Sequence, residues 1–409
     1  MAHETDRLEA DAHCGDVPVR AIALLALASF ASAANLRVCD PLLPQIAGQL
    51  GVTVGTASLT VTGFALAYGV LQVVIGPLSD ARGRLRTVVL GSLWAGAATL
   101  VSATMPALEP LAVTRFFAGM GAAAIIPVAI AWIGDVVPYE QRQPVLARYI
   151  SGQIMGIVFG QAAGGLLGDL IGWRFTLVLM GLVHVVAGLL LLAEMRRLKI
   201  APPTSGRVQW LGAAASARAV LRDAWVRTVL ISVFIEGMAM FGALAYVGAD
   251  LHERFGLSLG AVGALLAAFG IGALCYSLTA GRLVPWLGQA RLALIGGAIL
   301  AAGYASLALI PWAWLAVPGI AMVGLGFYML HNTLQTNATQ MAPHARGLAV
   351  SLFAFMLFCG QSVGVVLAAP LMDRYGGRPI FLISALVVLS VAAWFCRQLV
   401  RRKAAQTAG

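Results

Sequence analysis

The sequence predicts an all-helical protein that crosses a membrane twelve times, with its helices divided equally between two halves. Sixty per cent of the 409 residues are hydrophobic and 11% are charged, whereas soluble domains carry nearer a quarter charged residues. Apolar runs of about 20 residues, each long enough to cross a hydrocarbon core of about 30 Å, recur along the whole chain. Turn residues and loop charges also repeat in register between the two halves.

The first half is expected to follow a polar tail, residues 1–19, which lacks the pattern of a cleavable signal peptide, so the first helix should be retained. This half should span residues 20–195. Its six expected helices cover residues 20–43, 57–79, 87–107, 110–137, 144–170 and 173–195.

A basic linker, residues 196–224, should separate the halves. Its amphipathic patch at 210–221 fits either a helix on the membrane surface or a plain linker helix, and both alternatives stay open. The second half should span residues 225–400 and precede a basic tail, residues 401–409. Its six expected helices cover residues 225–247, 259–285, 291–310, 313–341, 347–372 and 378–400.

The distribution of positive charge predicts the orientation in the membrane. Most of the 27 Lys and Arg residues fall on loops or tails of one side, which should therefore be cytoplasmic. Twelve crossings return both termini to that side. We therefore expect a multi-pass protein of the bacterial inner membrane, in which the net charge of +10 reflects orientation and not nucleic-acid binding. Four arginines fall on the opposite side: Arg174, Arg254, Arg374 and Arg378.

An internal repeat supports the division into halves. At an offset of 205 residues, Gly83 matches Gly288, and at 204, Asp169 matches Asp373. Six helices per half give the two repeats the same orientation, so the symmetry axis runs along the membrane normal. In such parallel repeats the substrate site lies between the halves near the middle of the bilayer.

The segment between the second and third expected helices carries a specific motif. Gly76, Asp80, Gly83 and Arg84 match the loop signature of the major facilitator superfamily, although Ala81 and Leu85 replace two of its basic positions. The resemblance implies that Asp80 caps the helix that starts near Gly347 when the cytoplasmic side is closed. It also implies that Arg84 reaches Asp135.

Further segments resemble the same family over nearly the whole chain. Arg115 with Gly119, and Asp135 with Arg142, look like its fourth helix and the loop that follows. Residues 156–165 resemble its antiporter signature, with Gln161 in place of a proline. This glycine face suits close packing and sliding against a neighbouring helix equally well. It consists of Gly156, Gly160, Gln161, Gly164 and Gly165.

Three charged residues lie inside the first half: Arg37, Asp40 and Arg115. Each should have a partner, since a charge at the bilayer centre costs at least about 2.5–3.5 kcal/mol. Asp40, about 30 Å along the first helix, and Arg115, about 8 Å down the fourth, should lie at similar depth. Asp40 is then able to pair with Arg37 or Arg115. A structural or gating pair and a proton or substrate role both stay open.

Glu236 is the sharpest candidate for a proton carrier. It lies about 16 Å into the seventh helix, near the middle of the membrane. No Lys or Arg lies within eight residues of it in sequence, so its carboxyl group should stay protonated until water or a cation arrives. In the tenth helix, His331 and Gln335 share one face and are expected to line a polar vestibule or to bond neighbouring helices.

The resemblance is closest to bacterial 12-helix drug and sugar efflux permeases. It implies proton-coupled efflux of a small organic molecule by alternating access, from a functional monomer in the lipid bilayer. An importer or symporter of an organic anion, and a non-transporting sensor on the same scaffold, remain as alternatives. No catalytic, phosphate-binding or metal-ligand motif is apparent, so we expect no enzyme activity, no cofactor and no direct use of ATP.

Overall fold

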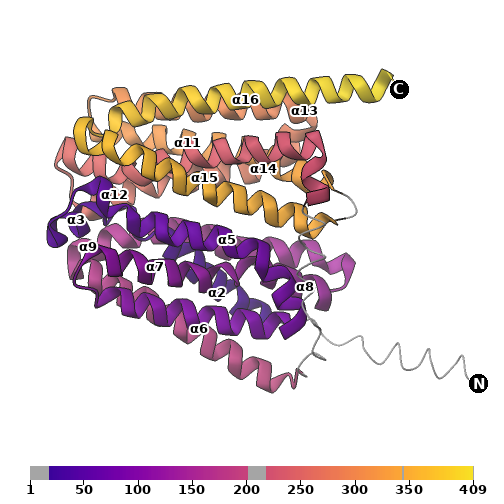
Figure 1. Cartoon of the computed structure of the whole chain (residues 1–409), viewed down its shortest axis with the longest axis horizontal. Coiled ribbons are helices and arrows are strands. Elements are labelled where there is room, and N and C mark those ends of the chain that lie inside the picture. The colour runs from indigo at the N-terminus through magenta and orange to yellow at the C-terminus, as the bar shows by residue number, and fades with distance from the viewer. Residues whose placement is uncertain (1–17, 201–217, 343–344, 409) are drawn as a thin grey trace, which may run out of the picture.

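The computed structural model describes residues 18–200, 218–342 and 345–408, and within them the chain forms helices and no strands. Figure 1 shows two groups of helices side by side, one from each half of the sequence. The tail at 1–17 and most of the patch at 210–221 lie outside the described residues. The first group comprises α2 (Val19–Arg37), α3 (Leu43–Leu50), α4 (Val54–Ala57), α5 (Leu59–Arg82), α6 (Arg84–Ala103), α7 (Leu108–Ala123), α8 (Ile126–Val136) and α9 (Tyr139–Arg197).

The second group repeats this arrangement. It comprises α11 (Ala224–Phe255), α12 (Leu259–Leu266), α13 (Ala268–Leu309), η1 (Ala313–Leu315), α14 (Ala316–Gln340), α15 (Arg346–Tyr375) and α16 (Gly377–Ala408). Ten helical segments of the described chain are long and apolar enough to cross a membrane. Two of them, Gln141–Arg197 and Leu259–Leu309, double back at Gly172 and Gly288. The predicted twelve-helix fold is therefore confirmed.

Glycines form the tight reversals at equivalent places in the two halves. Gly83 has a φ of 90° and its repeat partner Gly288 a φ of 68°. At the opposite end, Gly172 and Gly376 have φ values of 81° and 72°. Residues with a Cβ rarely adopt these angles. The backbone of the turns thus explains why glycine recurs in register.

Two boundaries differ from the sequence-based expectation. The first helix ends at Arg37 and not at Leu43, because Pro41 lacks an amide N–H and its ring excludes the carbonyl four residues earlier. Asp40 therefore lies in the turn that follows the helix. The segment at 76–86 is mostly helical, since α5 continues to Arg82 and α6 starts at Arg84.

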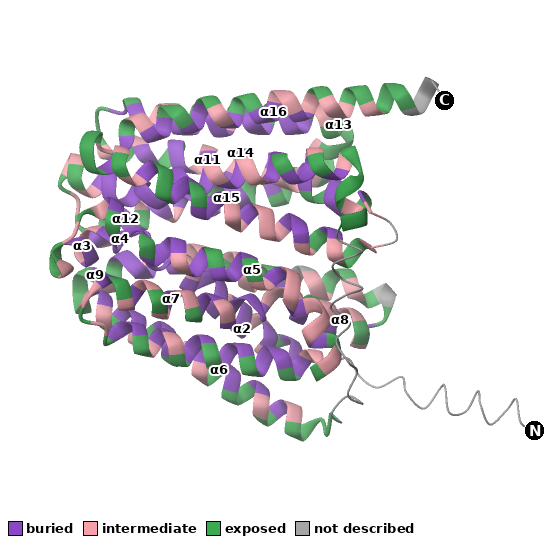
Figure 2. Cartoon of the chain, viewed as in Figure 1, coloured by how far each residue is buried: buried purple, intermediate pink, exposed green. Residues whose placement is uncertain are grey.

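The two halves meet along two pairs of helices. Helix α5 packs against α15, and α9 packs against α12. Figure 2 shows buried residues concentrated between the helices and exposed ones on the outer surfaces. Large apolar side chains such as Leu90 and Trp94 are exposed there, as a surface that faces lipid requires. We call the end that carries Gly83 the basic end and the end that carries Gly172 the distal end; in Figure 1 they lie at the right and the left.

Candidate functional site

A cleft of about 1100 Å³ opens between the two halves at the basic end. The first half contributes α5, the start of α6 and α8, and the second half contributes the end of α14 and the start of α15. Asp80 and Arg84 lie on one wall, and Gly347 and Ser351 lie on the other. The motif singled out in the sequence therefore borders the space between the halves.

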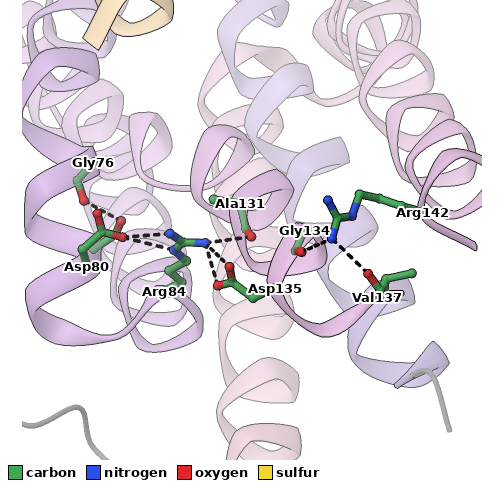
Figure 3. A network of polar contacts seen from close by, with 9 residues as sticks. Gly76, Asp80, Arg84, Ala131, Gly134, Asp135, Val137 and Arg142 are labelled. Carbon is green, nitrogen blue, oxygen red and sulfur yellow. Dashed lines mark hydrogen bonds and ion pairs between the residues drawn. The ribbon is translucent and has the colours of Figure 1, made fainter. Parts of the chain in front are cut away.

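Arg84 organises a polar network beside this cleft (Figure 3). Its Nη1 lies 2.6 Å from both carboxylate oxygens of Asp135 and donates to the Ala131 carbonyl at 2.9 Å. Its Nε and Nη2 each lie 3.1 Å from Asp80 Oδ1. The expected contact between Arg84 and Asp135 is thus present. Both acids have side chains more than half exposed, so each pair contributes at most about 1 kcal/mol.

Neighbouring contacts complete the network within the first half. Arg142, on α9, donates to the carbonyls of Gly134 and Val137 at 2.5 and 3.2 Å and so ties the end of α8 to the start of α9. Gly76 accepts a hydrogen bond from Ser79 at 2.8 Å. Among the described residues, Asp80 is bound to Arg84 of its own half and to no residue of the second half.

The glycine face of α9 makes two different contacts. A Cβ at Gly156, Gly160 or Gly164 would lie 2.4–2.6 Å from backbone oxygens of α2 and the turn that follows it, in the same half. A Cβ at Gly165 would lie 2.1 Å from the Leu259 oxygen, on α12 of the other half. Gln161 is buried between these contacts, and α9 continues through it unbroken. Three of the glycines therefore serve packing within the half, whereas Gly165 sits at the boundary between halves.

Asp40 pairs with Arg37 and not with Arg115. Arg37 Nη1 lies 3.6 Å from Asp40 Oδ2, and both side chains are almost completely buried. The Arg37 guanidinium also lies 4.1 Å from the ring centroid of Phe241 in α11, so this residue of the first half contacts the second half.

Arg115 is held by a residue that the sequence analysis missed. Its Nη1 donates to Asn35 Oδ1 at 2.6 Å, and its Nη2 donates to the Asn35 carbonyl at 2.8 Å. The guanidinium also lies 4.5 Å from the ring centroid of Phe64. Asn35 is fully buried and donates to Thr99 at 2.8 Å. The sequence did offer a signal: Asn35 is a polar residue in a run of apolar and small residues, two positions before Arg37.

Glu236 is not isolated, contrary to the expectation from the sequence. His331 Nδ1, on α14, lies 2.9 Å from Glu236 Oε2. Glu236 is fully buried, and its Oε1 has no hydrogen-bond partner within the described part of the chain. The His331 ring stacks on Phe327, with centroids 4.8 Å apart, and contacts Phe353 at 5.3 Å. The result is a carboxyl–imidazole pair in an aromatic environment inside the second half.

The polar face of α14 is divided between two surroundings. His331 is bonded to Glu236, whereas Thr339, two turns further on, lines the cleft. Gln335 is exposed and is not among the residues that line the cleft. Among the described residues, no group of three or more His, Cys, Asp or Glu side chains is arranged to hold a metal ion.

Comparisons with known proteins agree with this architecture. The sequence model of the Major Facilitator Superfamily matches residues 25–365. A chloramphenicol resistance protein of Streptomyces lividans is 28% identical over an alignment 386 residues long, which covers 91% of this chain and 94% of the relative. The multidrug efflux protein YfmO of Bacillus subtilis is 25% identical, with 90% of each chain covered.

Solved structures show the same fold. The crystal structure of the nucleoside transporter NupG matches with a TM-score of 0.75 at 12% identity, over 94% of this chain and 99% of NupG. A bacterial homologue of the human lysosomal transporter Spinster matches with a TM-score of 0.72 at 18% identity, over 93% and 97% of the two chains. With the twelve helices and the motif around Arg84, these matches show that the chain belongs to the Major Facilitator Superfamily of membrane transporters.

Proposed function

We propose that the protein exports a small organic molecule in exchange for protons, by alternating access, with the basic end and both termini in the cytoplasm of a bacterial cell. The excess of Lys and Arg on the loops of that end supports the orientation. In this orientation the cleft of about 1100 Å³ opens to the cytoplasm, where a substrate for export would enter. Efflux is also the activity named for relatives such as YfmO.

The pair of Glu236 and His331 is the observation that carries the proposal. A fully buried carboxyl group without a permanent cation beside it is costly to ionise, so it binds or releases a proton according to which end admits water. His331, 2.9 Å away, orients the carboxyl group. In the proposed cycle, Glu236 takes up a proton when the distal side opens and releases it to the cytoplasm.

The other buried charges fit supporting roles in this cycle. Arg37 is already paired with Asp40, and Arg115 with Asn35. Both arginines are buried, and neither is among the residues that line the cleft. This arrangement favours a fixed ion pair at Asp40 over a proton carrier. It also weakens the alternative in which Arg37 or Arg115 binds an organic anion during import.

Proton movement in everted membrane vesicles tests the proposal. Chloramphenicol and puromycin should be tried first, because relatives confer resistance to them, followed by a panel of sugars and organic acids. Addition of a substrate should release protons from acidified vesicles that contain the protein. Absence of substrate-dependent proton movement across the whole panel would contradict proton-coupled export.

A second measurement tests the role of Glu236 as the proton carrier. Glu236→Gln should abolish proton release while substrate exchange across the membrane continues, because a neutral amide still fits but does not titrate. Glu194→Gln is the matched control: Glu194 is also buried, but it pairs with Arg20 near the ends of their helices. Proton release by Glu236→Gln at the parental rate would exclude Glu236 as the carrier.

A further inference from the structure

Two aspartates at the distal end occupy equivalent positions in the halves, and each binds the start of a helix from the opposite half. Asp169, on α9, accepts hydrogen bonds from the amides of Leu259 and Gly260 at 3.0 and 2.6 Å. These two residues begin α12.

The same arrangement recurs in the other half. Asp373, on α15, accepts from the Gly55 amide and the Thr53 hydroxyl, both at 2.7 Å. Thr53 is the N-cap and Gly55 the second residue of the span that runs from Val54 to Arg82. The acids are related by the offset of 204 residues found in the sequence, and Gly55 and Gly260 by the offset of 205. Figure 2 labels α4, α9 and α12 close together at the left, which is the distal end.

Each aspartate cap can form only while the distal ends of the two halves are in contact. The first amides of a helix lack partners within it and carry a partial positive charge, so a carboxylate is a favourable cap. A Cβ at Gly55 would lie 2.6 Å from Asp373 Oδ2, and one at Gly260 would lie 3.0 Å from Asp169 Oδ2. Glycine thus lets the carboxylate approach. Since each acid and its helix belong to different halves, separation of the distal ends breaks both caps.

Further contacts join the halves on the same side. The Tyr246 hydroxyl on α11 donates to Ser58 Oγ at 2.8 Å, and Arg37 lies over Phe241. At the basic end, the motif has one acid, Asp80, which binds Arg84 of its own half, and the repeat copy has Pro285 at that position.

We infer that Asp169 and Asp373 are positioning residues that form a two-fold distal latch and set the resting state of the transporter as open at the basic end. The inference rests on the alternating access of the proposed function, and it requires neither export nor proton coupling. Loss of one cap should raise the population of the state open at the distal end about fivefold, because removing an N-cap side chain typically costs about 1 kcal/mol.

Thiol labelling of purified protein in lipid nanodiscs tests this inference without a substrate. The five natural cysteines are replaced by serine, and one reporter is added as S58C, at a position that is buried between the halves. Asp169→Ala and Asp373→Ala should each raise the rate of S58C labelling by a maleimide about fivefold, and the double variant should raise it further. Asp169→Asn and Asp373→Asn should have smaller effects, because asparagine retains one of the two accepting oxygens and so keeps one of the two bonds.

Asp223→Ala is the matched control. Asp223 caps the start of α11 through the amides of Trp225 and Val226, at 2.6 and 3.2 Å, but this contact lies within one half. Asp223→Ala should therefore leave S58C labelling at the parental rate. The inference is overturned if the Asp169 and Asp373 variants label like the parent, or if Asp223→Ala accelerates labelling equally. Failure of the export proposal would leave these labelling rates unaffected.

Discussion

Gly160→Ala should push the first arm of α9 away from α2 and destabilise the first half. The new Cβ would lie 2.4 Å from the Ala34 carbonyl oxygen, and this oxygen is backbone and has no rotamer to change. The helices must separate by roughly 0.6–1.0 Å to restore an ordinary contact. Such overpacking costs about 1–3 kcal/mol, and the better helix propensity of alanine returns about 0.5–1 kcal/mol. We expect a net loss of up to about 2.5 kcal/mol.

Thermal unfolding of the detergent-solubilised protein, followed by tryptophan fluorescence, measures this loss. The apparent Tm of Gly160→Ala should fall by a few degrees. Gly134→Ala is the control, because nothing lies within 4 Å of its new Cβ, and its apparent Tm should stay level or rise. Equal apparent Tm values for the two variants would refute the assignment of Gly160 to tight packing.

Gly165→Ala tests whether glycines of the same motif differ in role, one in opening of the distal end and the others in packing within the first half. Its Cβ would meet the Leu259 oxygen of the other half at 2.1 Å, a clash that separation of the distal ends relieves. We expect S58C labelling to rise in Gly165→Ala and to stay at the parental rate in Gly160→Ala. The opposite pattern would show that the roles of the two glycines are reversed.

Two more predictions concern the polar contacts. Asp80→Ala should reduce transport while membrane insertion and the contact between Arg84 and Asp135 persist, because the family resemblance implies that Asp80 caps the helix starting near Gly347 when the basic end closes; parental transport rates would disprove that role. Asn35→Leu should destabilise the protein by about 1.5–3 kcal/mol in chemical or thermal unfolding, since buried Arg115 loses its 2.6 Å acceptor. Adding Arg115→Leu should restore part of that stability, and a purely additive double variant would contradict the pairing.

Much of the fold could be predicted because its signals are local. Apolar runs of membrane length mark the helices, and glycines with positive φ mark reversals such as Gly83 and Gly288. The contact between Arg84 and Asp135 followed from a short motif. The end of α2 at Arg37 was also readable, since Pro41 stands four residues later.

The partners of the buried charges could not be predicted, because helix packing brings them together. Glu236 and His331 are 95 residues apart, and Arg115 and Asn35 are 80 apart. Depth along a helix gives the level of a side chain in the membrane but not the direction in which it points. Asp40 therefore had two possible partners at the same level, and the packed structure shows that it pairs with Arg37.

The charges around Arg115 expose the transporter to the membrane potential. Arg37 is paired with Asp40, whereas Arg115 is held by the uncharged Asn35, so this buried region of the first half has a formal charge of +1. Full transfer of one charge across a membrane at about 100 mV involves about 2.3 kcal/mol. Any step that shifts this cluster relative to the field, or that admits water to it from one side, is favoured or opposed by voltage as well as by substrate.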